Sequence, residues 1–205
     1  MLEIGVLALQ GDVAEHIQAA RHASEKKKMQ IRLRTVRTAQ ELAGLQGLLL
    51  PGGESTTLSL LLQKNSMLEP MKEIPGLFGT CAGLILMAKQ VEGMVEGQKG
   101  LELMDVSVGR NAYGSQMDSF ESIIECTGKG LDLGKAKIPF IRAPKIIRVG
   151  AGVSILSKHP TTGEPVMVEE KMAGKFYLGA ACHPEMVTSK AHEYFLEQLE
   201  LGLKQ

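Results

Sequence analysis

A cysteine stands between two glycines in the stretch Gly79-Thr80-Cys81-Ala82-Gly83, after an apolar run and before a helical pattern. This spacing is typical of a nucleophile elbow, a strand-to-helix turn that lifts a reactive side chain into a cleft. Glycine at both flanks removes Cβ atoms that would clash in so tight a turn, and the amides of the following helix favour a thiolate. A lone cysteine in an apolar region is more often a buried structural thiol. The glycine frame is what makes Cys81 a candidate nucleophile.

A cysteine nucleophile needs a base and a group that orients the base, and the tripeptide His183-Pro184-Glu185 supplies both. Proline biases the residue before it towards extended geometry, and side chains two residues apart in an extended chain project to the same face. Glu185 is then placed to accept a hydrogen bond from one ring nitrogen of His183, and the other nitrogen faces the thiol. Isolated His-x-Glu strings are common, so the weight of this motif comes from its pairing with Cys81.

A second glycine-rich turn covers residues 51–55, Pro-Gly-Gly-Glu-Ser. Two interpretations stay open. The turn is either a plain strand–helix connection capped by Ser55, or its backbone amides at Gly53 form an oxyanion hole together with the amide of Ala82. It is not a phosphate loop, because the lysine of that motif is missing.

The elements that must position these residues alternate between strand and helix patterns along the first half of the chain. Apolar runs at 2–9, 31–36, 47–50 and 76–78 predict strands, and the segments between them and after them predict helices at 13–27, 38–43, 56–64 and 84–90. Asp12 is placed to cap the first of these helices. Such alternation predicts an α/β three-layer sandwich with a mostly parallel central sheet and helices on both faces. Ligands of such sheets bind at the carboxyl ends of the strands, where both glycine turns and His183 fall.

The middle of the chain, 101–178, has short β-rich segments separated by glycine or proline, which predict antiparallel hairpins that extend the sheet. A last helix is expected at 189–203. No long polar linker intervenes, so we expect one domain over residues 1–205.

Composition excludes several classes of partner. The 205 residues carry a formal net charge of +0, which indicates neither nucleic acid nor an anionic membrane as a partner. No apolar run reaches the roughly 20 residues that span a bilayer, and the opening residues 1–10 lack the basic region of a signal peptide. The three cysteines, Cys81, Cys126 and Cys182, are widely spaced and show no metal-ligand pairing, which fits free thiols in a cytoplasmic protein.

Together the motifs make the chain resemble the class I, or triad, glutamine amidotransferases, and more narrowly the glutaminase subunits of pyridoxal phosphate synthases. The resemblance spans almost the full length. It rests on residues 9–11, 15–16, 50–57, 78–84, 110–111, 118–121 and 140–144. The stretches 51–57 and 140–144 are specific to the narrower group, whereas the triad is not.

The resemblance implies Cys81 as nucleophile, His183 as acid and base, and Glu185 as its orienter. It also implies contacts to glutamine from six residues: Gly53, Glu54, Ser55, Arg110, Ile141 and Arg142. The implied reaction is hydrolysis of L-glutamine to L-glutamate and ammonia through a thioester on Cys81. The ammonia then passes to a separate synthase subunit, in a hetero-oligomer that builds pyridoxal phosphate. No metal and no organic cofactor is implied.

Two rival functions share part of this pattern. A glutaminase of another pathway, such as imidazole glycerol phosphate synthase, would carry the same triad, but the Gly-Gly-Glu-Ser-Thr turn argues against it. A non-catalytic protein could use Cys81 as a redox-sensing or binding thiol, but such a thiol needs no oriented base. The chain also departs from the family pattern. Cys182 stands where relatives carry an aromatic residue; it is either a packing substitution, which we favour, or a second oxidisable thiol beside the site. The segment 158–174 is longer than expected.

Overall fold

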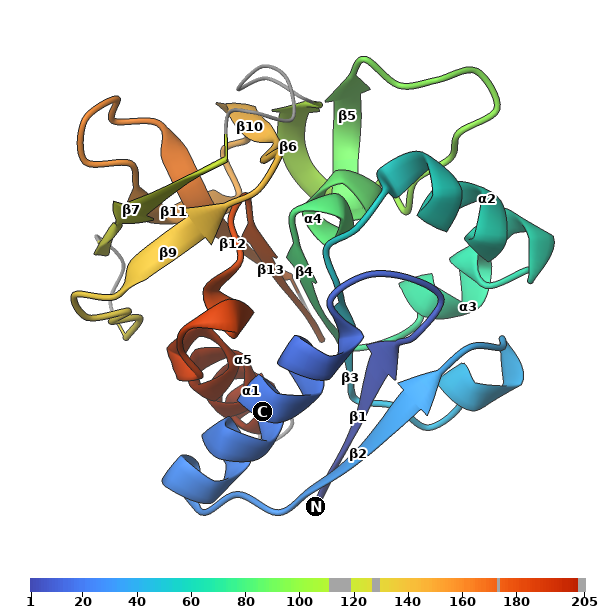
Figure 1. Cartoon of the computed structure of the whole chain (residues 1–205). Helices are drawn as coiled ribbons and strands as arrows, with labels where there is room; N and C mark the ends of the chain where they lie inside the picture. The colour runs from blue at the N-terminus through green and yellow to red at the C-terminus, as the bar shows by residue number, and fades with distance from the viewer. Residues whose placement is uncertain (111–118, 127–129, 173, 203–205) are drawn as a thin grey trace.

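An eight-stranded sheet forms the centre of the molecule, with the strand order β2-β1-β3-β4-β13-β12-β11-β8 (Figure 1). The structure is a computed structural model and describes residues 1–110, 119–126, 130–172 and 174–202. The parallel strands lie side by side at one end of this order. They are β2 (Ile31–Val36), β1 (Leu2–Leu7), β3 (Gly47–Leu50), β4 (Gly76–Thr80) and β13 (Lys175–Ala180).

The other end of the sheet is antiparallel, as the sequence predicts. β12 (Pro165–Met172) pairs with β13, β11 (Val153–Lys158) pairs with β12, and β8 (Glu125–Cys126) pairs with β11. Two smaller sheets lie beside it, β10-β6-β5 and β7-β9. Their strands are β5 (Ala88–Glu92), β6 (Met104–Gly109), β7 (Phe120–Ile123), β9 (Lys137–Phe140) and β10 (Lys145–Val149).

The segment that follows Cys81 differs from the prediction. The helix expected over 84–90 is α4 (Ala82–Met87), which is shorter and starts earlier, and the chain continues directly into β5. β5 pairs in parallel with β6, so this part of the β-rich region is not purely antiparallel. Pairing with β6 outweighs the helix propensity of residues 88–90, because tertiary contacts override weak local preferences.

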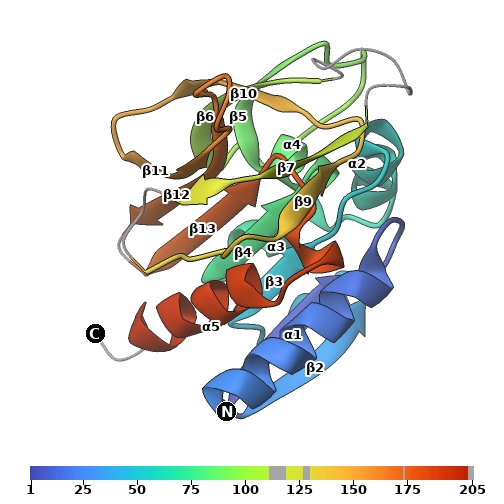
Figure 2. The same ribbon diagram turned by 60° about the vertical axis from the view of Figure 1, so that its left-hand side comes forward.

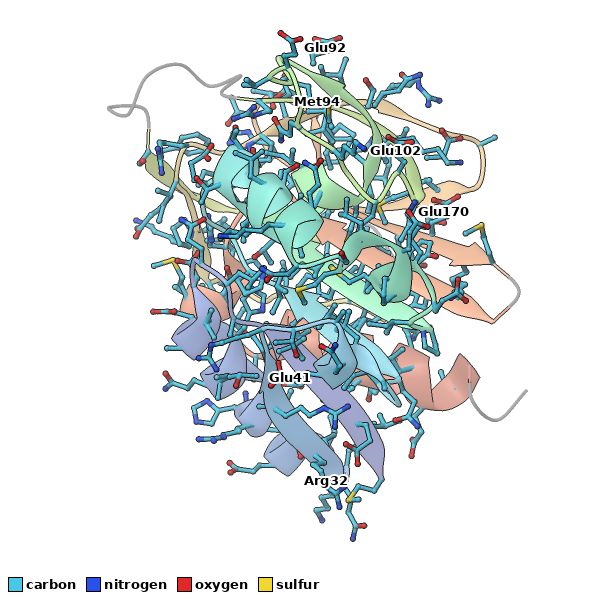
Figure 3. The ribbon with its side chains drawn as sticks, turned by 90° about the vertical axis from the view of Figure 1, so that its right-hand side faces the viewer. Arg32, Glu41, Glu92, Met94, Glu102 and Glu170 are labelled. Carbon is cyan, nitrogen blue, oxygen red and sulfur yellow. The ribbon has the colours of Figure 1, made fainter. Side chains whose placement is uncertain are left out.

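Helices cover both faces of the sheet (Figures 1 and 2). Successive strand residues alternate between the faces. Ile4, Val6, Leu49 and Phe78 share one core cluster with residues of α1 (Val13–Lys27) and α5 (Lys190–Gly202). Leu7, Leu48, Leu50 and Leu77 share the other with α2 (Ser55–Lys64), α3 (Leu68–Lys72) and α4. Figure 3 looks onto the α2 and α3 side, with Arg32 of β2 at one end and Glu92 and Met94 at the other. The predicted three-layer α/β architecture is confirmed.

Smaller differences concern helix ends. The helix expected at 38–43 is a 3-10 turn, η1 (Gln40–Leu42). The side chain of Asp12 makes no capping hydrogen bond to α1. The last helix begins at Lys190, and Leu203, its expected end, lies outside the described residues, as do Asn111 and Asp118 of the family motifs. Within the described ranges, no helix has both the length and the apolar character needed to cross a membrane.

Candidate active site

Cys81 occupies a strained turn between β4 and α4. Its backbone angles, φ 48° and ψ −104°, lie outside the regions that residues other than glycine normally adopt. The Cys81 amide donates to the Ala180 carbonyl at 2.8 Å, and the Cys81 carbonyl accepts from the Ile85 amide at 3.2 Å. Strain of this kind persists only where the surroundings over-determine it, as they do at a nucleophile elbow.

Close packing requires the two glycines that frame Cys81. A Cβ atom on Gly79 would lie 2.5 Å from the carbonyl carbon of Gly83, and one on Gly83 would lie 2.1 Å from the Leu50 carbonyl oxygen. The first contact is the clash expected for a tight turn. The second joins the elbow to β3, which fixes the position of Cys81 relative to the turn at 51–55.

The imidazole of His183 lies between the thiol and a buried carboxylate. His183 Nδ1 is 2.9 Å from Glu185 Oε1, and the ring lines the same cavity as the side chain of Cys81. The side chains of His183 and Glu185 are 4% and 0% exposed. The tripeptide is not extended as predicted: Pro184 begins a 3-10 turn, η2 (Pro184–Met186), and this turn brings Glu185 back onto His183.

A second carboxylate reaches the same nitrogen. Asp12 Oδ2 lies 3.0 Å from His183 Nδ1, and the Asp12 side chain is 34% exposed. The loop that carries Asp12 packs on the turn at 51–55, because the Asp12 amide donates to the Gly52 carbonyl at 3.3 Å. A Cβ atom on Gly52 would lie only 2.4 Å from His183 Cε1, so only glycine leaves room for the ring.

These contacts make His183 a strong base. Burial opposes a charge on the ring, but hydrogen bonds with Asp12, Cys81 and Glu185 outweigh it and raise the pKa of His183 to about 12. Burial raises the pKa of Glu185, and hydrogen bonds from His183 and Thr80 counter that rise. The hydrogen bond with His183 lowers the pKa of Asp12. Both carboxylates lie on the Nδ1 side of the ring, where they stabilise its protonated, imidazolium form.

The turn at 51–55 connects β3 to α2 and is capped by Glu54, not by Ser55 as one interpretation of the sequence had it. Glu54 Oε2 accepts from the Thr57 amide at 2.7 Å, and Ser55 is the first residue of α2. Gln10, in the loop between β1 and α1, supports the turn, since its Oε1 accepts from the Glu54 amide at 3.0 Å. The interpretation in which Ser55 caps the helix is therefore wrong. The oxyanion role of Gly53 and Ala82 stays a proposal.

A cavity of about 130 Å³ opens directly over Cys81. It is far smaller than the roughly 300–1,000 Å³ of pockets that hold drug-sized ligands, and so suits a small metabolite. Most of the residues predicted from the sequence meet here. The lining consists of Asp12, Gly53, Glu54, Ser55, Cys81, Ile85, Arg110, Ile141, Arg142 and His183. Of the predicted site residues, Glu185 and Ala82 do not line the cavity, and Glu185 lies behind His183.

The cavity carries opposite charges on one wall. Arg110 Nη2 lies 3.3 Å from Glu54 Oε1 and 3.0 Å from Thr56 Oγ1, with the Arg110 side chain only 10% exposed. Another wall is formed by Ile141 and Arg142. Arg142 has a left-handed φ of 46°, and the Ile141 carbonyl lies 3.9 Å from Cys81 Sγ. A cation and an anion side by side match a zwitterion such as a free amino acid.

Three acidic or histidine side chains converge closely enough to be considered as metal ligands. Ligand atoms of Asp12, His183 and Glu185 lie within 4.8 Å of one another. Metals bind the neutral imidazole, however, and this arrangement stabilises the imidazolium. The donor set therefore fits a proton better than a metal ion.

The remaining candidate residues lie away from the cavity lining. Cys182 is fully buried in the core cluster with α1 and α5, and burial raises its pKa well above 9.0. Cys126 is half-buried in β8. His159 belongs to the loop between β11 and β12 and accepts from the Thr161 amide at 3.3 Å. The burial of Cys182 agrees with its interpretation as a packing residue.

Sequence reasoning missed Asp12, Ile85 and Thr80 as neighbours of the site. Asp12 was interpreted as a helix cap, and its position before α1 gives no sign that the side chain turns towards a strand end 171 residues further along. His16 and His192 fall in the segments predicted as the first and last helices, where helix-packing or surface roles are the default expectation. Both are buried, and His16 Nε2 lies 3.6 Å from Glu185 Oε1. The Glu15-His16 motif was the available signal.

Comparison with known proteins decides the family. Residues 6–201 match the model of the SNO glutamine amidotransferase family. The chain belongs to this family. The resemblance stated from the motifs is thereby confirmed, and the chain is a glutamine amidotransferase.

Individual relatives cover nearly the whole chain. A Thermococcus onnurineus protein named "Pyridoxal 5'-phosphate synthase subunit PdxT" is 44% identical over 97% of this chain and 99% of its own length. A Korarchaeum cryptofilum protein of the same name is 42% identical over 98% and 100%. A crystal structure of a glutamine amidotransferase superposes with a TM-score of 0.78 at 36% identity, covering 96% of this chain and 98% of that one. A putative GMP synthase subunit from Thermoplasma acidophilum, 15% identical with a TM-score of 0.59, supports the fold alone.

Proposed function

We propose that this chain is the glutaminase subunit of a pyridoxal 5'-phosphate synthase, with Cys81 as nucleophile, His183 as acid and base, and Glu185 as the residue that orients His183. One observation carries the proposal. The Cys81 thiol and the His183 imidazole line a small charged cavity, and the buried Glu185 carboxylate is hydrogen-bonded to His183 from behind. The pathway is supported by the names of relatives that match the chain over nearly its full length.

Glutamine would bind with its two charged groups at the mouth of the cavity. Arg110 supplies donors for the α-carboxylate, and Glu54 supplies acceptors for the α-ammonium. Gly53, Ser55, Ile141 and Arg142 would shape the space between them, and the carboxamide would reach Cys81. Because Arg110 and Glu54 pair with each other at 3.3 Å, each would exchange a protein partner for a substrate group.

The chemistry proposed has two halves. The Cys81 thiolate attacks the carboxamide carbon, the backbone amides of Gly53 and Ala82 hold the oxyanion, and the imidazolium of His183 protonates the nitrogen that leaves as ammonia. A γ-glutamyl thioester remains. Water then gives a proton to His183 and attacks the thioester carbon, which releases glutamate and restores the Cys81 thiolate. The reaction calls for no metal or organic cofactor.

Ammonia release from glutamine tests the proposal. The chain should release ammonia, and the rate should rise when the synthase subunit is added, whereas a Cys81→Ala variant should release none in either condition. Cys126→Ala is the matched control, since that thiol lies outside the cavity. Equal release by Cys81→Ala and the wild type would contradict the nucleophile assignment.

The partner decides between pathways. We propose a hetero-oligomer with the synthase subunit, one glutaminase domain over residues 1–205, and a cytoplasmic location, the last supported by three free thiols. Co-purification with a pyridoxal phosphate synthase subunit should succeed. Activation by a synthase subunit of the imidazole glycerol phosphate type instead would overturn the pathway and leave the triad untouched.

A further inference from the structure

A row of buried polar side chains continues from Glu185 into the core, away from the cavity. Thr80 Oγ1 donates to Glu185 Oε1 at 3.0 Å, His16 Nε2 lies 3.0 Å from Thr80 Oγ1, and His16 Nδ1 lies 3.0 Å from His192 Nε2. The row connects η2, the end of β4, α1 and α5. All four residues are buried, His16 and Thr80 completely.

The hydrogens of this row all point the same way. A hydroxyl has one hydrogen, and Thr80 uses it on a carboxylate that can only accept, so Thr80 must accept from His16 Nε2–H. Burial lowers the pKa of His16 well below 6.5, which leaves Nδ1 of the neutral ring as an acceptor. His192, whose pKa burial lowers to about 3, then donates through Nε2–H. Its Nδ1 is left as a lone pair without a partner among the described residues.

The row of hydrogen bonds ends on Glu185 Oε1, the oxygen that is also hydrogen-bonded to His183. Glu185 Oε1 accepts from both Thr80 and His183, whereas Oε2 has no partner within the described part of the chain. Thr80 therefore fixes the rotamer in which Oε1 faces His183. Packing alone would explain why the histidine rings contact Phe78, at centroid distances of 6.0 and 5.1 Å. It would not explain three consecutive hydrogen bonds that end on this oxygen.

We propose that Thr80 and His16 are positioning residues for the glutaminase reaction, with Thr80 holding the Glu185 carboxylate against His183, His16 orienting the Thr80 hydroxyl, and His192 setting the tautomer of His16. The proposal rests on the triad roles proposed above. It assigns a function to two buried residues that touch neither substrate nor thiol, and it predicts that they change turnover and leave glutamine binding alone.

Paired variants at Thr80 give the first test. Thr80→Val keeps the shape and removes the hydroxyl, and Thr80→Ser keeps the hydroxyl. Loss of a hydrogen bond to a buried carboxylate should lower kcat for glutamine about 10- to 100-fold in Thr80→Val, with KM within roughly twofold of wild type. Thr80→Ser should stay within roughly threefold in kcat. Wild-type kcat in Thr80→Val, or equal losses in both variants, would overturn the proposal.

Position 16 gives the second test. His16→Gln places an amide donor near the Nε2 position and should retain most of the turnover, whereas His16→Leu should lose it about as Thr80→Val does. The double variant Thr80→Val/His16→Leu should be no worse than the poorer single variant, because both act through one row. His22→Leu, on the exposed side of α1, is the matched control and should behave as wild type. Multiplying losses in the double variant would contradict a shared row.

A measurement without turnover keeps the two proposals separable. In nitrogen-15 NMR of histidine-labelled protein, His16 and His192 should both appear as neutral rings protonated at Nε2. An Nδ1–H tautomer at His16 would reverse the row and refute the positioning role even in a fully active enzyme. Loss of activity in Cys81→Ala with the predicted tautomers intact supports both proposals. An active Cys81→Ala variant would refute the triad and the positioning role with it, whereas the Nδ1–H tautomer at His16 would refute the positioning role alone.

Discussion

Removing the charge of Asp12 should lower the pKa of His183 by a predictable amount. Asp12 Oδ2 lies 3.0 Å from His183 Nδ1, and its side chain is 34% exposed. For a partly solvated pair of charges an effective dielectric constant of about 50 is appropriate, and Coulomb's law then gives an attraction of about 2 kcal/mol between Asp12 and the protonated His183. That energy corresponds to about 1.5 pKa units. Asp12→Asn should therefore lower the pKa of His183 from about 12 to about 10.5.

Glu185 provides the internal comparison. Its Oε1 is 2.9 Å from the same nitrogen, but its side chain is completely buried, so an effective dielectric constant of about 20 applies and the attraction is about 6 kcal/mol. Glu185→Gln should lower the pKa of His183 by about 4 units, to about 8. The structure thus predicts an order: the buried carboxylate matters more than the half-exposed one, although the distances are nearly equal.

The assay is a pH titration of the His183 ring nitrogens by nitrogen-15 NMR in wild type and both variants. Asp132→Asn, which removes an equal charge at the protein surface, is the control and should leave the titration unchanged. An Asp12→Asn titration that superimposes on wild type would show that Asp12 does not share the proton. A larger shift in Asp12→Asn than in Glu185→Gln would refute the burial argument.

Three further predictions follow from the packing. Gly83→Ala should lower the free energy of unfolding by about 3 kcal/mol or more in urea denaturation, because its Cβ would lie 2.1 Å from the Leu50 carbonyl, whereas Gly202→Ala, with open space around it, should cost nothing. His192, with a pKa of about 3 against 6.5 when unfolded, favours the fold above pH 6.5 and loses this contribution as the pH falls. Through this residue the free energy of unfolding should fall by about 2 kcal/mol from about pH 7.5 to about pH 5. The variant His192→Gln should not show this loss, and an unchanged pH dependence in that variant would contradict the prediction. Iodoacetamide should modify Cys81 and spare Cys182, and modification of Cys182 under native conditions would place that thiol outside the core.

The sequence was sufficient for the architecture and for the convergence of the site. Apolar runs of strand length predicted the strands of the parallel sheet, and glycine spacing predicted the elbow, because both depend on local rules of burial and backbone sterics. The carboxyl ends of parallel strands must meet at one edge, so Cys81, His183 and the turn at 51–55 were expected together. The cavity lining agrees with that expectation.

What the sequence could not predict depends on long-range contacts. Asp12 before a helix has the local signature of a cap, and only the packing of the 10–12 loop on Gly52 turns it towards His183. The 3-10 turn that returns Glu185 to His183 likewise overrides the extended geometry that proline favours. The strand at 88–92 has no strong pattern of its own and forms because β6 pairs with it. In each case the deciding partner is distant in sequence.

The central claim is that Cys81 carries the glutamyl group during hydrolysis. Rapid acid quenching of the chain with its synthase partner during turnover, followed by peptide mass spectrometry, tests it most directly. The account predicts an adduct on Cys81 with the mass of glutamine minus ammonia, absent from Cys126 and Cys182 and from any Cys81→Ala sample. Continued ammonia release with no adduct on Cys81, or an adduct on another residue, would contradict it.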